Sequence, residues 1–194
     1  MKVLLAHLDE LNQHIQELDN EIDGSMKQDE KDACKAIEDV PGIGESSAQA
    51  IISVIGTDMS RFPTEKHISK WAGVCPGDNE SAKKRKSCKT TKGNKVLRTT
   101  LVSCAHAAVK VKDSFFSAQF SRICAHRGTK KAYMAVAHSL LIAIYHILST
   151  GEVFHDLGAN YYNQFNKERK AESLLKKLKS LGFDVTVATA ETSA

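Results

Sequence analysis

The sequence lacks the patterns that would indicate a metal-stabilised fold or a nucleotide-binding P-loop. It contains no Walker-type loop and no internal repeat, and its cysteines form neither a CxxC pair nor a Cys/His pair at zinc-finger spacing. An odd, scattered set of cysteines is typical of reduced and buried thiols in a cytosolic protein. The cysteines are Cys34, Cys75, Cys88, Cys104 and Cys124.

The chain also has no apolar run typical of a secreted or membrane protein. Its opening, MKVLLAHLDE, becomes charged after a very short apolar stretch, which excludes a normal signal peptide. The longest apolar region, residues 132–148, is interrupted by His138 and His146 and predicts a buried helix rather than a membrane span. We expect these two histidines and His106 to be core residues rather than metal ligands.

Acidic residues are absent between Glu80 and Asp113, where Lys and Arg are frequent. The net charge of +4 is mild, so this is a local concentration of charge, which is typical of a surface that binds a polyanion. Ser81 stands at its edge, where a hydroxyl suits either phosphate binding or attack on a phosphodiester. The basic residues are Lys83, Lys84, Arg85, Lys86, Lys89, Lys92, Lys95 and Arg98.

The first 25 residues predict an amphipathic helix with a heptad seam. Apolar residues recur in alternating steps of four and three, as at the a and d positions of a coiled coil. These are Leu4, Leu8, Leu11, Ile15, Leu18 and Ile22. Two interpretations remain open: pairing in a dimer or an antiparallel hairpin, or packing of the helix on its own domain.

A turn between two further helical segments predicts a helix-hairpin-helix motif. Residues 27–38 and 45–55 have helical periodicity, and VPGIG joins them. Gly42 and Gly44 would let the backbone approach a phosphate, with the amides of the second helix pointing at it. Such contacts hold DNA without reading its sequence. The alternative is a plain turn between packed helices.

The remainder predicts short helices around one glycine-rich loop. A helix that begins near Thr64 and ends at Gly73 should bury Ile68 and Trp71, and the loop at 74–91 should become an ordered hairpin only with a ligand or neighbour. Helices are expected at 94–111, with Val96 among its inward residues, at 114–126 and at 130–148, followed by a basic amphipathic helix in the tail.

The predicted fold class is mainly α: a coiled-coil arm, then a helical domain with a helix-hairpin-helix motif and a basic Gly-rich loop. We place the arm at residues 1–38, the domain at 39–187 and a disordered tail at 188–194. A length of 194 residues, with 42% hydrophobic and 26% charged residues, is ordinary for such a folded protein.

Six segments in this order resemble the Piv-like DEDD transposases of the insertion-sequence one-ten family. They are VPGIGESSAQAI, DMSRF, WAGVCPGDNESA, KGNKVLR, AHSLLIAIYHIL and DLGANYY. The resemblance covers about residues 39–187 and corresponds to the C-terminal transposase domain of that family. One departure concerns the loop: many members continue SAGK, whereas this chain reads SAKK, so that Lys83 replaces a permissive glycine.

The resemblance implies a catalytic role for Ser81 and a second domain that supplies metal. The family has an N-terminal RuvC-like domain with four metal-binding carboxylates, and this chain shows no such quartet. We therefore expect no cofactor in this chain, Mg²⁺ to come with the RuvC-like domain, and the chain to be a fragment. Lysines and arginine beside Ser81 would stabilise charge during attack on phosphorus.

The favoured interpretation is the DNA-binding, serine-bearing part of an insertion-sequence transposase, inactive without its RuvC-like domain. The alternative is a non-catalytic helix-hairpin-helix nucleic-acid-binding module, so enzymatic activity stays open. Implied partners are DNA, a guide RNA as in some members, the RuvC-like domain and a second copy bound through the arm. The expected location is the cytoplasm, at the nucleoid.

Overall fold

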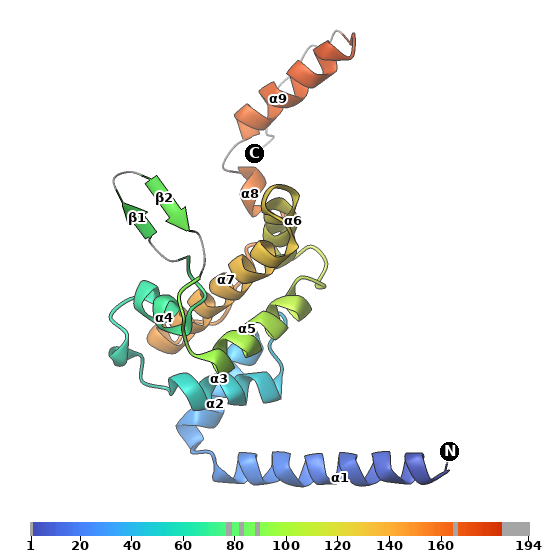
Figure 1. Ribbon diagram of the computed structural model, residues 1–194, viewed down its shortest axis with the longest axis vertical. Coiled ribbons are helices and arrows are strands. Elements are labelled where there is room, and N and C mark those ends of the chain that lie inside the picture. The colour runs from blue at the N-terminus through green and yellow to red at the C-terminus, as the bar shows by residue number, and fades with distance from the viewer. Residues whose placement is uncertain (1, 77–78, 82–83, 88–89, 165–166, 184–194) are drawn as a thin grey trace, which may run out of the picture.

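The computed structural model describes residues 2–76, 79–81, 84–87, 90–164 and 167–183 and confirms the mainly α-helical fold (Figure 1). In chain order the elements are α1 (Lys2–Ser25), α2 (Gln28–Glu38), α3 (Glu45–Ile55), the 3₁₀ turn η1 (Met59–Arg61), α4 (Glu65–Ala72), β1 (Asn79–Ser81), β2 (Lys84–Ser87), α5 (Lys95–Ala108), α6 (Phe115–Arg127), α7 (Thr129–Thr150), α8 (Tyr161–Gln164) and α9 (Lys167–Ser180).

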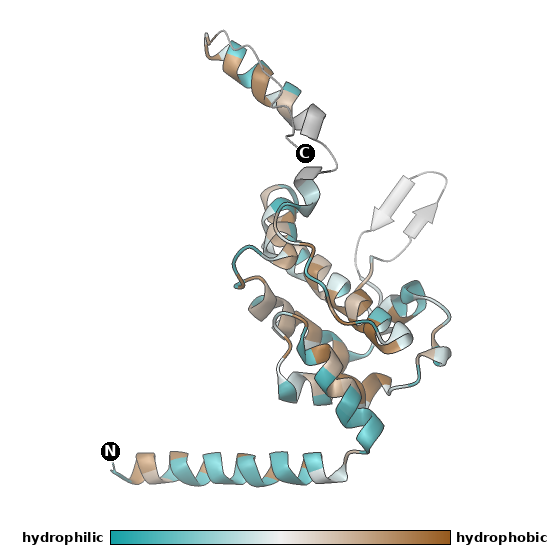
Figure 2. Cartoon of the chain, turned by 180° about the vertical axis from the view of Figure 1, so that it is seen from behind, coloured by the Kyte–Doolittle hydropathy of each residue, from teal (hydrophilic) through white to brown (hydrophobic). Residues whose placement is uncertain are grey.

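Helix α7 is the central helix of the domain. It packs against α2, α4, α5 and α6, and in Figure 2 the apolar stretches of these helices meet in the middle of the domain. Its length and composition would also suffice to cross a membrane. A helix surrounded by others is apolar on several faces, which accounts for this sequence. Its buried residues are Ala132, Val136, Ala137, Leu140, Leu141, Ile144 and Ile147.

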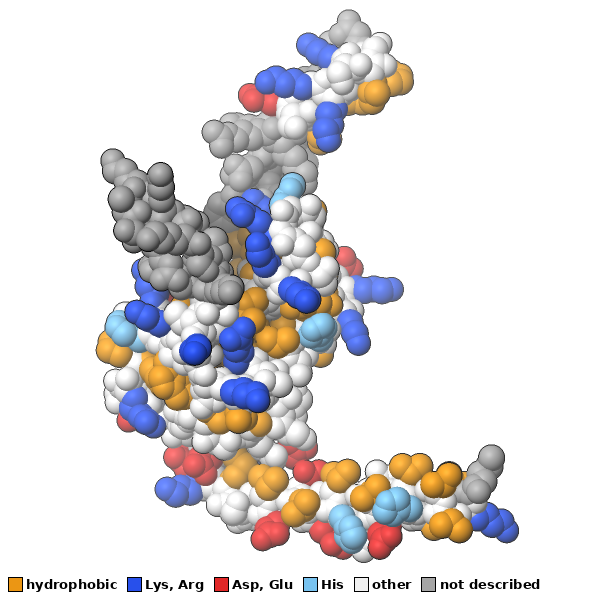
Figure 3. All heavy atoms as spheres, in the orientation of Figure 1, with side chains coloured by type: hydrophobic (Ala, Val, Ile, Leu, Met, Phe, Trp, Pro, Cys, Tyr) orange, Lys and Arg blue, Asp and Glu red, His pale blue; other side chains and the backbone are white. Residues whose placement is uncertain are grey.

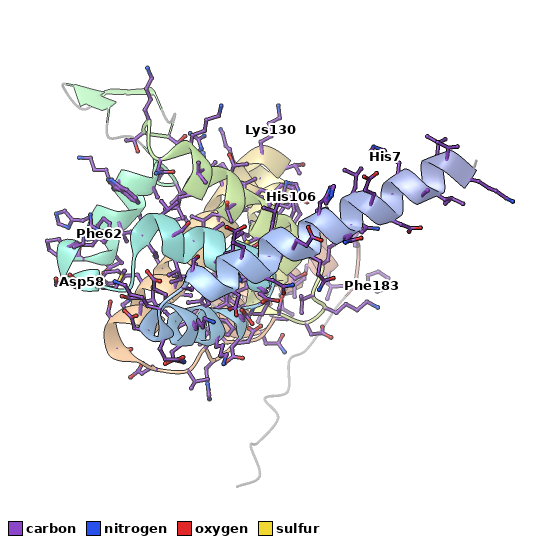
Figure 4. All side chains as sticks on the ribbon, turned by 90° about the horizontal axis from the view of Figure 1, so that it is seen from below. His7, Asp58, Phe62, His106, Lys130 and Phe183 are labelled. Carbon is purple, nitrogen blue, oxygen red and sulfur yellow. The ribbon has the colours of Figure 1, made fainter. Side chains whose placement is uncertain are left out.

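Helix α1 extends away from the domain as a separate arm (Figures 1 and 4). It has no buried residue, and its six seam residues are between 44% and 70% exposed. Packing of this helix on its own domain, one of the two interpretations, is therefore not observed. Pairing of the seam with a second helix stays a prediction.

Two apolar residues expected in the core are exposed. Trp71 is 41% exposed because the buried side of α4 is formed by Ile68, Ser69 and Ala72, which leaves Trp71 at its flank. The Trp71 ring contacts that of Phe62, with centroids 5.4 Å apart. Val96 is 59% exposed because the inward side of α5 begins at Leu97. In each case the neighbouring position along the helix takes the buried place.

The segment after α7 returns to α6 and fixes its start. Asp156 Oδ1 accepts hydrogen bonds from the backbone N–H groups of Phe115 (2.9 Å) and Gly158 (2.8 Å). The ring of Tyr162 stacks on that of Phe115, with centroids 5.3 Å apart, and lies under the Arg122 guanidinium. Beyond it α9 projects from the domain (Figure 1). The predicted disordered tail, 188–194, lies outside the described residues.

Candidate nucleic-acid interface

The basic loop contains a short antiparallel hairpin. Ser81, the last residue of β1, is the register partner of Lys84, the first residue of β2, and Glu80 is the partner of Arg85. Lys86 lies on the same strand as Lys84 and Arg85. The backbone therefore brings the serine position next to the cluster of positive charge. Lys83 and Lys89 lie outside the described residues.

The base of the hairpin is fixed to the end of α4. Pro76 and Thr90 form an isolated antiparallel bridge, the Thr91 hydroxyl donates to the carbonyl of Lys70 at 3.2 Å, and the Asn94 amide donates to the carbonyl of Trp71 at 3.3 Å. These bonds join segments about 20 residues apart in sequence. The segments that enter and leave the loop therefore have a defined base on the domain.

Three predicted DNA-binding residues lie at the start of α5 beside this base, Lys92 just before the helix and Lys95 and Arg98 in its first two turns. Lys92 and Lys95 are exposed and Arg98 is half-buried. Asn94 caps the helix by accepting from the Leu97 amide at 3.0 Å. The first turn contains no acidic residue, although the helix dipole favours anions there by roughly 0.3–1 kcal/mol each. Cations in this place form a surface suited to an external polyanion.

The same face continues onto α6 and α7, which sequence reasoning missed. Asp113 is the only acidic residue between Glu80 and Glu152, so α6 and α7 have none. Figure 3 shows Lys and Arg side chains over this face below the hairpin, and Figure 4 shows Lys130 at the edge from which the hairpin extends. The sequence does contain a signal for this longer face, because Asp113 is the one acidic residue in the whole segment between Glu80 and Glu152. The cations of α6 and α7 are Arg122, Arg127, Lys130 and Lys131, and of these Arg127 and Lys131 line a pocket with Pro76 and Thr90 at the base of the hairpin.

The two glycines of the VPGIG turn occupy different environments. Gly42 has a φ of +87° and lies against the backbone of α5, where a Cβ would be 2.5 Å from the carbonyl oxygen of Cys104. Gly44 is the N-cap of α3 and has no atom within 4 Å of the corresponding position. Val40 and Ile43 are buried. The turn therefore contributes to packing, and Gly44 is its open position; DNA binding by this helix pair stays a prediction.

The described residues contain no group of three or more His, Cys, Asp and Glu side chains that could hold a metal ion. The prediction that three histidines are core residues is wrong for His106 and His146, which are exposed. His106 stacks on Tyr133, whereas His138 is half-buried and burial lowers its pKa. The described thiols are free, with Cys34 and Cys104 buried. The described residues therefore offer no ligand set for a divalent cation.

Comparison with known families identifies the segment that contains the turn and the hairpin. Residues 34–121 match the model of the transposase family described as IS116/IS110/IS902. The match supports a transposase domain of that family over these residues. No curated protein matches the chain. The transposase domain supports an insertion-sequence transposase role, and a transposase acts on DNA, which makes DNA the partner that this domain implies.

The matched segment ends within α6, although the folded unit does not. Helix α7 follows the match and supplies the centre of the core against which α2, α4 and α5 of the transposase domain pack. The basic face likewise extends past residue 121 to Arg127, Lys130 and Lys131. The transposase domain and the helices that follow it therefore share one core and one charged surface.

Proposed function

We propose that this chain is the DNA-binding, serine-bearing part of an insertion-sequence transposase. The supporting observation is a charged face of one sign on the folded unit that contains the transposase domain: the hairpin, the start of α5 and the α6–α7 end carry cations with Asp113 as the one acid between Glu80 and Glu152. Lysine and arginine side chains on this face neutralise phosphates and hold the DNA backbone. Gly44, at the open N-terminus of α3, adds a backbone contact.

Ser81 is the nucleophile in this proposal. A serine hydroxyl reacts poorly at neutral pH without a base or a metal ion, and the described residues offer no ligand set for a metal. Mg²⁺ therefore comes with a RuvC-like domain, from the same protein or from another protomer. The residues of this chain bind the phosphodiester and place positive charge beside it, at Lys84, Arg85 and Lys86 of β2.

The chain acts as a dimer through α1 in this proposal. The seam consists of large apolar side chains that are exposed on an arm away from the domain, as Figure 3 shows, so burial against another helix would remove them from water. Ile15 and Ile22 fall at a positions and Leu11 and Leu18 at d positions. This distribution favours a parallel coiled coil of two helices. The protein would work on DNA in the cytoplasm, at the nucleoid.

Substitution of Ser81 in a full-length transposase that carries this domain tests the catalytic role. Ser81→Ala should abolish strand transfer while DNA affinity stays within about twofold. Lys84→Ala/Arg85→Ala/Lys86→Ala should lower both the rate of strand transfer and the affinity for DNA. The reason is that these residues hold the DNA backbone and also stabilise the charge that develops on the phosphate. Strand transfer by Ser81→Ala at the wild-type rate would contradict the role of Ser81 as nucleophile. It would favour a second candidate function.

That second candidate is a non-catalytic nucleic-acid-binding module in which Ser81 only contacts a phosphate. The lack of a metal-ligand set in the described residues favours it, since nothing there activates a hydroxyl. The same basic face would suit a structured RNA as well as DNA, because both present phosphates. Binding without any effect of Ser81→Ala on recombination is the result that this candidate predicts.

A further inference from the structure

A pocket of about 400 Å³ lies where the base of the hairpin meets α6 and α7. Val74 and Pro76 line it from the segment entering the hairpin and Thr90 from the segment leaving it. Its volume lies within the range of small-ligand sites, roughly 300–1,000 Å³. Binding of a duplex backbone across the basic face does not require such a hollow.

The walls of the pocket are mainly apolar. Met134 and Ala135 of α7 face Val74 and Pro76 across it. A thioether adapts its shape to the group that it contacts. These walls suit an uncharged, flat group.

Polar groups are set among these apolar walls. Gln119 Nε2 donates to Ser139 Oγ at 2.8 Å, which fixes the orientation of the amide, and His138 lines the pocket beside them. Desolvation lowers the pKa of His138, so its imidazole is neutral and offers one donor and one acceptor. An amide and a neutral imidazole match the donor and acceptor edges of a nucleobase.

Arg127 and Lys131 line the same pocket and are exposed to solvent. Neither takes part in an ion pair with a described residue, and α6 and α7 contain no acidic residue. The two positive charges are therefore available to anions next to the occupant of the pocket. A base with a phosphate on either side has this combination of a flat apolar group and flanking charge.

We propose that this pocket receives one unpaired nucleobase of the bound nucleic acid, with its flanking phosphates on Arg127 and Lys131. The proposal rests on the proposed nucleic-acid binding and adds that the domain takes a base out of the helical stack. Such extrusion costs a few kcal/mol for a paired base and less for one that is already unpaired. The pocket should therefore select bulged or melted sites.

Two DNA duplexes with the same bulge test the proposal, one with 2-aminopurine as the bulged base and one with an abasic bulged nucleotide. The backbone and its flexibility are then matched, and only the base differs. The wild-type chain should bind the base-containing bulge at least about fivefold more tightly, with a change in 2-aminopurine emission. The same pair built in RNA shows whether DNA or RNA supplies the base.

Ala135→Phe fills the pocket without altering its charges, and Ala107→Phe on the exposed side of α5 is the matched control. The preference for the base should fall to within about twofold of unity in the first variant and stay unchanged in the second. Thermal unfolding shows whether Ala135→Phe keeps the fold. If it does not, Arg127→Ala/Lys131→Ala should lower the salt slope on the bulged duplex by roughly 1.8.

Equal affinity of the wild-type chain for the base-containing and abasic bulges would overturn the proposal that the pocket receives a base. Binding of the nucleic-acid backbone would be unaffected by that result. Preservation of the preference in folded Ala135→Phe, or of the salt slope in Arg127→Ala/Lys131→Ala, would also overturn it. Failure of the wild-type chain to bind any of these nucleic acids would instead contradict the proposed function itself. The two failures are therefore distinguishable.

Discussion

Gly73 and Gly93 lie backbone against backbone where the hairpin leaves the domain. A Cβ on Gly73 would be 2.7 Å from the amide nitrogen of Gly93 and 2.8 Å from the carbonyl oxygen of Thr91. Gly73 also has a φ of +73°, in the left-handed region that favours glycine. The position of the hairpin, and with it that of Ser81, depends on this contact.

Gly73→Ala should therefore destabilise the domain by about 2–4 kcal/mol, because the methyl group meets backbone atoms that cannot rotate away. Urea denaturation measures the change in the free energy of unfolding. Gly24→Ala is the control, since no atom lies within 4 Å of its Cβ position. Equal stability of the two variants would show that the backbones do not touch in this way.

Gly42 and Gly44 should respond differently to alanine. Gly42→Ala should lower stability by about 2 kcal/mol or more, because its Cβ would meet the α5 backbone, whereas Gly44→Ala should cost less than about 1 kcal/mol as an N-cap change. DNA affinity should fall in folded Gly44→Ala, where the added methyl group stands in front of the α3 amides. Urea denaturation and DNA titration of both variants check this pair, and a stable Gly42→Ala protein would contradict the packing role.

The buried Cys34 thiol should resist alkylation. Burial, followed by the nearby carboxylates of Glu38 and Glu30, raises its pKa to about 11. At pH 8 only about one thiol in a thousand is then ionised, and the thiolate is the reactive form. A pulse of iodoacetamide followed by mass spectrometry should modify half-buried Cys75 and Cys124 first and Cys34 only after unfolding in urea. Alkylation of Cys34 as fast as Cys124 in the folded chain would contradict its burial.

Charges placed in the α1 seam should separate the proposed dimer. Leu11→Glu/Ile15→Glu should give a monomer in sedimentation, because like charges would face each other at the d and a positions. Gln13→Glu/Gln16→Glu adds the same charge on other faces of the helix and should leave the dimer intact. Neither pair should change the unfolding of the domain, since α1 has no buried residue. A wild-type monomer at micromolar concentration would remove the dimer from the proposal.

Local signals predicted the helices well. Ser114 caps α6 by accepting from the Ser117 amide at 3.1 Å, and Gly73 and Gly151 end α4 and α7 in the left-handed conformation. These features depend on a few neighbouring residues. They are therefore visible in sequence without knowledge of the tertiary structure.

The site was less visible because contacts between distant segments form it. The strands of the hairpin consist of residues with little strand propensity. The contact of Gly93 with Gly73 holds its base, and hydrophobic periodicity in the sequence does not indicate such a contact. Arg127 and Lys131 join the hairpin only through the packing of α6 and α7. Trp71 was placed in the core by its apolar character, although the adjacent Ala72 is the residue that is buried.

The salt dependence of DNA binding tests most directly whether the basic face holds the phosphate backbone. The comparison is between the wild-type chain, Lys92→Ala/Lys95→Ala/Arg98→Ala and the control Lys2→Ala/Lys27→Ala/Lys35→Ala, which removes the same charge from exposed positions of α1 and α2. The α5 variant should lose roughly 2.7 from the slope of log affinity against log salt, about 0.9 for each lost contact. The control should keep the wild-type slope. Equal slopes for all three proteins would contradict the assignment of this face as the nucleic-acid interface.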